Sequence, residues 1–203
     1  LRVAFDSQKR FLDGAAHELR APITIVRGHL ELLDDDPDER AKDIDLVLDE
    51  VDRMARLVEE LRVLARSERP DFLTLEDVDV GALVADIGRK AEAMAPREWV
   101  VEPGAAGVVR ADGQRLTQAV LNLVDNAVSV TSEGTRIEIG SSDGDGTVAL
   151  WVRDHGPGID PTDLPSLFDR EGRTISRRPG GTGLGLPIVA AVCLALAALG
   201  NVD

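Results

Sequence analysis

The chain has 203 residues, of which 43% are hydrophobic and 30% charged, and these proportions are typical of a folded globular protein. Its formal net charge of −14 argues against a nucleic-acid-binding surface, which would need clustered lysine and arginine. The single cysteine, Cys193, excludes an internal disulfide and a thiolate metal cluster, and its apolar sequence neighbours predict a buried thiol.

The first third of the chain carries two helical patterns joined by a short acidic loop. Residues 1–33 predict a first helix, Pro37 follows its end, and a second helix is expected from about residue 38 to 66. Apolar residues recur every seven positions in both helices, as in the a/d seam of a coiled coil. In the first helix the two series are Ala16, Ile23, Leu30 and Leu12, Leu19, Val26, Leu33, and the second seam is Ile44, Val47, Val51, Met54, Val58, Leu61.

Two amphipathic helices joined by a short loop form an antiparallel hairpin, and one hairpin alone cannot bury both seams. Two hairpins can bury them as a four-helix bundle, so we predict a homodimer through residues 1–67. The alternative is a hairpin that packs against the second domain of the same chain.

The pattern changes after a break at residues 67–70, and a second domain is expected over residues 72–203. Asp112 is the expected N-cap of a central helix, and a turn at Gly144 is expected to join two strands as a hairpin. Helices alternating with strands in this way predict an α+β domain with helices on one face of a mixed sheet. Strands are expected at 73–78, 99–102, 108–111, 135–141 and 147–153, helices at 80–94, 112–130 and 184–199, and mostly loop at 156–182.

His17 directly follows a seam position, so its side chain is expected at the flank of the first helix, within reach of a partner domain. A neutral imidazole is a good nucleophile near neutral pH. Glu18 can accept the proton of one ring nitrogen and leave the other free to attack phosphorus. Pro22 is expected to kink the helix, because it removes a backbone hydrogen bond. Taken by itself, His17 is better explained as a solvated surface residue.

Two patterns in the second domain suit nucleotide binding, although each also has an ordinary structural interpretation. Asn122 and Asn126 share a helix face because they are four residues apart, and amide oxygens are suitable ligands for Mg²⁺. Asp154 ends an apolar strand before Gly156 and Gly158, so its carboxylate can accept a hydrogen bond from an adenine amino group.

A glycine-rich segment, residues 180–186, opens the last helix and exposes backbone N–H groups to an anion. The segment is not a Walker loop, because no Gly-Lys-Ser/Thr follows. It is not a dinucleotide-binding fingerprint either, because the order of strand, turn and helix differs.

These motifs occur in one order, and together they resemble the motifs of two-component sensor histidine kinases. Residues 11–22 resemble the histidine box and residues 122–127 the asparagine box. Residues 154–159 and 180–186 resemble the two glycine boxes, and residues 167–170 the phenylalanine box. The resemblance covers nearly the whole chain.

The resemblance implies a dimerisation and phosphotransfer hairpin followed by a Bergerat-type ATP-binding sandwich. His17 would be the phospho-acceptor, Glu18 its general base, and the phosphoryl group would pass to an aspartate on the receiver domain of a response regulator. The implied cofactors are ATP and Mg²⁺, with Asn126 as the metal ligand and Asn122 assisting near the phosphates. Asp154 would bind the adenine amino group. The other implied nucleotide-binding residues are Gly156, Gly158, Gly181, Thr182, Gly183, Leu184 and Gly185.

The chain departs from the family pattern at several positions. Ala21 stands where the family usually has a threonine tied to phosphatase activity, so we expect weak phosphatase activity toward the regulator. Ser129 and Val130 replace a basic and an aromatic residue, and Glu171 replaces a frequent second phenylalanine, which would weaken nucleotide contacts and lid anchoring. The two strands that usually follow the last helix are either absent or divergent here.

Two rival functions remain at this point. An ATPase of the same superfamily would share the nucleotide motifs but lack the hairpin with His-Glu-x-Arg-x-Pro. A degenerate scaffold would dimerise and dock a regulator without catalysis, which the intact Asn126, Asp154 and lid glycines argue against.

The chain begins without methionine inside a helical pattern, which predicts a piece of a longer protein. No stretch reaches the roughly 18 apolar residues that span a bilayer. We expect the cytoplasmic portion of a sensor whose membrane anchor, if it has one, lies in segments absent from this chain. The signal, the cognate regulator and the choice between phosphorylation within a chain or across the dimer are left open.

Overall fold

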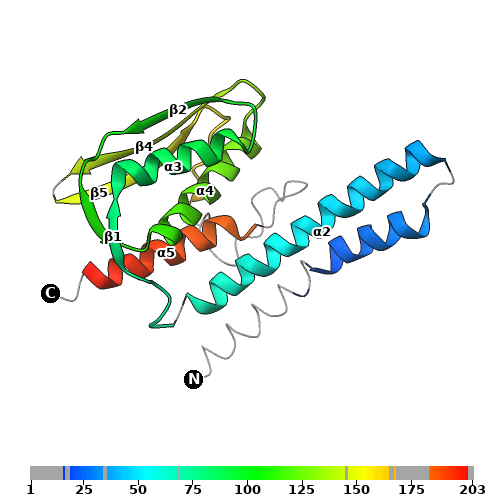
Figure 1. The fold of residues 1–203 in the computed structure, drawn as a ribbon, viewed down its shortest axis with the longest axis horizontal. Coiled ribbons are helices and arrows are strands. Elements are labelled where there is room, and N and C mark those ends of the chain that lie inside the picture. Colours follow the sequence, from blue (N-terminus) through cyan, green and yellow to red (C-terminus); the bar gives the residue numbers. More distant parts are fainter. Residues whose placement is uncertain are drawn as a thin grey trace. The chain divides into compact units, whose positions relative to one another are not determined.

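The computed structural model describes residues 16, 19–33, 36–67, 69–144, 146–164, 167 and 183–200. The chain divides into two compact units, with the division along the chain between Val63 and Leu64 (Figure 1). None of the helices within the described ranges combines the length and the apolar character needed to cross a bilayer.

The first unit is a helical hairpin. Residues 19–31 are helical, Pro22 included, and α2 (Pro37–Arg66) follows. Asp36 caps the start of α2, because its Oδ1 accepts a hydrogen bond from the N–H of Asp38 at 2.9 Å. The two helices are joined by a contact of 3.0 Å between His29 Nδ1 and Asp43 Oδ1.

The described residues of the second unit form two sheets. Strands β1 (Glu76–Asp79) and β3 (Val108–Ala111) form an antiparallel pair. In the larger sheet β2 (Glu98–Pro103) is parallel to β4 (Arg136–Gly144), and β4 is antiparallel to β5 (Thr147–Asp154). The larger sheet is therefore mixed, as the sequence predicts.

Helices α3 (Val80–Glu92) and α4 (Gly113–Val130) pack on one face of the larger sheet, and α5 (Gly185–Gly200) packs against α4 (Figure 1). A core between these layers joins α3, α4 and β4, and a smaller one lies at the start of α3. The buried members of the first core are Ile87, Ala91, Val120, Val124 and Ile139, and those of the second are Val80, Val84 and Ala105. A helical hairpin followed by this α+β unit confirms the predicted fold class.

The first strand begins three residues later than predicted. It starts at Glu76 rather than at residue 73, because the N–H of Thr74 donates to Asp112 Oδ2 at 2.8 Å instead of to a neighbouring strand. The strands predicted at residues 99–102 and 108–111, now β2 and β3, do not pair with each other but belong to different sheets.

The predicted hairpin is present: β4 and β5 pair antiparallel, and the turn follows directly after Gly144, which pairs with Thr147. One local prediction needs correction. The thiol of Cys193 is exposed, so the prediction of a buried thiol is wrong. Since α5 is apolar around most of its circumference, the neighbours of Cys193 in the sequence do not indicate which face is covered.

Candidate nucleotide-binding site

Helix α4 presents both predicted asparagines on one side. It begins at the predicted N-cap, where Asp112 Oδ1 accepts a hydrogen bond from the N–H of Arg115 at 2.9 Å. The apolar face with Val124 is buried in the core, which leaves Asn122 half-buried and Asn126 exposed.

Asn122 connects α4 to the start of α5. Its Nδ2 donates to the carbonyl oxygen of Gly185 at 3.3 Å. A Cβ on Gly185 would lie only 3.5 Å from the Cβ of Asn122, so the helices approach closely here. Gly183 just before α5 has a φ of 70°, a conformation that favours glycine. The structure therefore brings the asparagine motif next to the described end of the glycine-rich segment.

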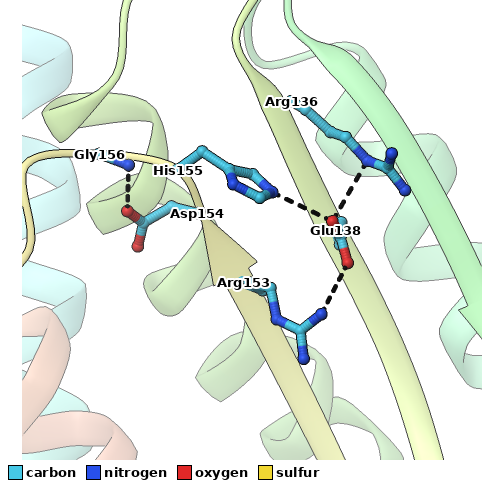
Figure 2. Close-up of polar contacts among 6 residues, drawn as sticks. All are labelled: Arg136, Glu138, Arg153, Asp154, His155 and Gly156. Atoms are coloured by element: carbon cyan, nitrogen blue, oxygen red, sulfur yellow. Dashed lines mark hydrogen bonds and ion pairs between the residues drawn. The ribbon is translucent and has the colours of Figure 1, made fainter.

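Asp154 is the last residue of β5, and its side chain is exposed. Its Oδ1 accepts a hydrogen bond from the N–H of Gly156 at 2.8 Å, which fixes the direction of the carboxylate (Figure 2). A carboxylate has a second oxygen, so Asp154 retains the capacity to accept a hydrogen bond from a ligand.

The turn after Asp154 packs against the end of α4. A Cβ on Gly156 would lie 2.8 Å from Asp154 Oδ1 and 3.0 Å from Val130 Cγ2. These contacts bring Asp154, Gly156 and Val130 together, although Val130 departs from the family pattern. Gly158 follows with a φ of 76°.

A cluster that the sequence analysis missed lies on the opposite face of the sheet. The side chain of Glu138 in β4 is only 8% exposed. Its carboxylate contacts Arg136 Nε at 3.2 Å, Arg153 Nη1 at 3.2 Å and His155 Nε2 at 3.1 Å (Figure 2). The hydrogen bond from His155 and the charges of both arginines hold the pKa of Glu138 below its ordinary value, and they outweigh the effect of burial.

The sequence feature that indicates this cluster is an acidic residue, Glu138, between Ile137 and Ile139 in a buried strand. Its basic partner can be identified only from the strand register, which pairs Glu138 with Arg153 across β4 and β5. The spacing along the chain does not reveal that register.

Some predicted site residues lie outside the residues that the structure describes. They are His17, Glu18, Gly181, Thr182 and the phenylalanine-box residues Phe168, Asp169 and Arg170.

The metal prediction can be tested against the donor atoms of the described residues. Within the described ranges no group of three or more His, Cys, Asp or Glu side chains could hold a metal ion. Mg²⁺ usually keeps several waters and takes phosphate oxygens of its nucleotide, so it needs few protein ligands. The exposed amide of Asn126 fits such an ion.

Two family models match the chain. Residues 7–70 match the His Kinase A (phospho-acceptor) domain, and residues 111–202 match the family of histidine kinase-, DNA gyrase B-, and HSP90-like ATPases.

Three histidine kinases illustrate what the chain is similar to. The probable sensor histidine kinase TcrY of Mycobacterium tuberculosis is 38% identical over 91% of this chain, and the match spans 40% of TcrY. The structure of the histidine kinase AdeS of Acinetobacter baumannii has a TM-score of 0.68 and 29% identity over 88% of this chain and 86% of AdeS. The mycobacterial sensor histidine kinase MprB has a TM-score of 0.51 and 31% identity over 60% of this chain and 79% of the MprB chain.

The fold and both matched domains define the class of this chain: a phospho-acceptor helical domain followed by an ATPase domain of the histidine kinase type. The chain belongs to the sensor histidine kinase family. It spans about two fifths of the length of its curated relative TcrY.

Proposed function

We propose that this chain transfers the γ-phosphoryl group of ATP to His17 and then to an aspartate of a response regulator. The observation that carries the proposal is the arrangement around α4, where Asn122 meets the start of α5 and the Asp154 turn meets Val130. The proposal is supported by the proximity of these segments to one helix, α4. We further propose residues 1–67 as the phosphotransfer domain and residues 72–203 as the ATP-binding domain.

In this proposal the second oxygen of Asp154 accepts a hydrogen bond from the adenine amino group. The amide oxygen of Asn126 holds Mg²⁺, which when bound neutralises charge on the phosphates. The remaining nucleotide contacts come from Asn122 and the glycine-rich segment, including Gly181, Thr182, Gly183, Leu184 and Gly185.

The transfer step needs one proton acceptor and one nucleophile. Glu18 accepts the proton from one ring nitrogen of His17, and the other nitrogen attacks the γ-phosphorus. A nitrogen–phosphorus bond forms while the bond to the β–γ bridging oxygen breaks, and ADP leaves. The regulator's aspartate later takes the phosphoryl group and frees His17.

The exposed apolar residues of the hairpin support a homodimer through residues 1–67. Ile23 and Leu30 are 52% and 51% exposed, and Ile44, Val51 and Val58 are 43%, 46% and 54% exposed. Each set recurs every seven residues, so each helix carries an apolar stripe. A two-fold partner hairpin would cover both stripes.

Incubation with γ-labelled ATP and Mg²⁺ tests the function. We expect a protein-bound label that is labile in acid and stable in base, absent from His17→Gln and strongly reduced in Asp154→Ala. A label that persists in His17→Gln would contradict the assignment of the phospho-acceptor. ATP turnover without label would indicate the ATPase alternative, and neither label nor turnover would indicate the scaffold.

A further inference from the structure

The carboxylate of Glu138 is much less exposed than the carboxylate of a surface ion pair such as Asp77–Arg110. The pair between Asp77 and Arg110 joins two strands at 3.2 Å, but both side chains are more than 60% exposed. Exposed pairs of this kind contribute little to stability. The carboxylate of Glu138 is nearly buried and contacts three basic side chains, so its contacts hold their partners much more firmly.

One of these partners belongs to the nucleotide-binding turn. His155 is the residue between Asp154 and Gly156, and its Nε2 lies 3.1 Å from Glu138 Oε1. A carboxylate oxygen only accepts hydrogen bonds, so the imidazole donates. Its side chain is 50% exposed, which means that the Glu138 contact, rather than burial, holds the ring in place.

Consecutive residues at the end of a strand point to opposite faces of the sheet. Figure 2 shows this alternation: Arg153 and His155 reach toward Glu138, while Asp154 points away from it toward the N–H of Gly156. The backbone of the turn is therefore held from both faces, by Glu138 on one side and by the Asp154–Gly156 hydrogen bond on the other.

We propose that Glu138 and His155 are positioning residues that set the direction of the Asp154 carboxylate and so the selectivity for adenine. The inference rests on the proposed function of Asp154. Without the Glu138 contact, the backbone at His155 can rotate, and rotation there turns the Asp154 carboxylate away from the adenine edge.

The test compares ADP with IDP, in which a carbonyl oxygen replaces the adenine amino group. Binding of each nucleotide with Mg²⁺ is measured by calorimetry for the unmodified chain, Glu138→Ala, His155→Ala, the double variant and Glu138→Gln. The unmodified chain is expected to prefer ADP. Loss of one oriented hydrogen bond corresponds to about a tenfold change in binding affinity. Each single alanine variant should therefore lower the preference for ADP over IDP by about tenfold.

The double variant and the glutamine variant separate positioning from general destabilisation. If both residues act through their mutual contact, the double variant should be no worse than either single variant. Glu138→Gln keeps an oxygen that can accept from His155, so it should retain most of the selectivity. Because His155 is half exposed, His155→Ala is expected to fold even if Glu138→Ala does not.

Arg136→Gln is the matched control, because Arg136 contacts the same Glu138 oxygen but is not itself a residue of the turn. It should leave the ADP/IDP ratio within about twofold. The positioning role would be overturned if His155→Ala and Glu138→Ala kept the ADP/IDP affinity ratio of the unmodified chain while Asp154→Ala lost the preference for ADP. The proposed function of Asp154 would then still stand. No preference in the unmodified chain, or a preference that survives Asp154→Ala, would instead contradict the proposed function of Asp154.

Discussion

Glu138 also makes the stability of the fold depend on pH. Its pKa in the folded state is held below the ordinary 4.5 by the His155 hydrogen bond and by the two arginines. A lowered folded-state pKa contributes stability that is complete above the unfolded pKa and is lost as pH falls through the folded one. The unmodified chain should therefore exceed Glu138→Gln in unfolding free energy at pH 6, and the difference should shrink below about pH 4.5.

Urea unfolding of both proteins at several pH values between 6 and 3.5 would measure this difference. A difference that stays constant or grows as the pH falls would show that the ionised form of Glu138 does not stabilise the folded state.

Gly156 has no room for a side chain. A methyl group there would lie 2.8 Å from Asp154 Oδ1 and 3.0 Å from Val130 Cγ2, so the Asp154 carboxylate or the turn itself would have to shift. We expect Gly156→Ala to weaken ADP binding by about tenfold or more, since it displaces the carboxylate proposed to bind adenine. Gly144→Ala is the matched control, because a Cβ at Gly144 meets nothing within 4 Å. Equal ADP affinities of the two variants would contradict the prediction.

Helix α4 depends on a basic residue from outside the helix at its C-terminal end. Its last turn has no basic residue of its own, and Arg97 Nη2 donates to the carbonyl oxygens of Val128 at 3.2 Å and Thr131 at 2.9 Å. A guanidinium group at a helix C-terminus satisfies free carbonyls and interacts favourably with the helix dipole. Arg97→Ala should therefore lower the unfolding free energy by about 1–2 kcal/mol.

Arg89→Ala provides the comparison, because Arg89 forms a surface ion pair with Asp86 at 3.0 Å. It should cost less than about 0.5 kcal/mol in the same urea experiment. Similar losses for both variants would show that the Arg97 contacts add nothing beyond a surface ion pair.

The elements with the strongest local signals were predictable from the sequence. Asp112 correctly predicts the start of α4 as its N-cap, and the predicted range 112–130 agrees closely with the observed Gly113–Val130. Local spacing could not supply information that depends on the packed sheet. The start of β1 differs from the predicted start because Asp112 accepts a hydrogen bond from the N–H of Thr74. The exposure of Cys193 depends on which face of an apolar helix is covered.

The candidate site divides in the same way. Asn122, Asn126 and Asp154 were identifiable as members of ordered motifs. Asn122 contacts Gly185 across a sequence separation of 63 residues. Glu138 contacts His155 across a separation of 17 residues. No short-range pattern encodes these contacts, because they follow from helix packing and strand register.

At the scale of the whole molecule, the proposed reaction requires a hairpin whose apolar stripe is covered by a second copy. Val51 belongs to the apolar series that recurs every seven residues, and it is 46% exposed. Leu46 is 50% exposed but lies outside that series. The two residues are five positions apart in the sequence, so on an α-helix they lie about 140° apart around the axis. Burying a carboxylate in a dimer interface is costly, whereas one on the solvated face costs little.

Val51→Glu should therefore dissociate the dimer, with at least about a hundredfold weaker self-association, and Leu46→Glu should leave it intact. Analytical ultracentrifugation over a range of concentrations would measure both, with circular dichroism to verify that each variant is folded. Because the two substitutions introduce the same charge at similarly exposed positions, a general effect of charge would appear in both. Dimers that survive Val51→Glu but not Leu46→Glu would show that the bundle uses the other face of α2, and the seam defined by the repeat would then be wrong.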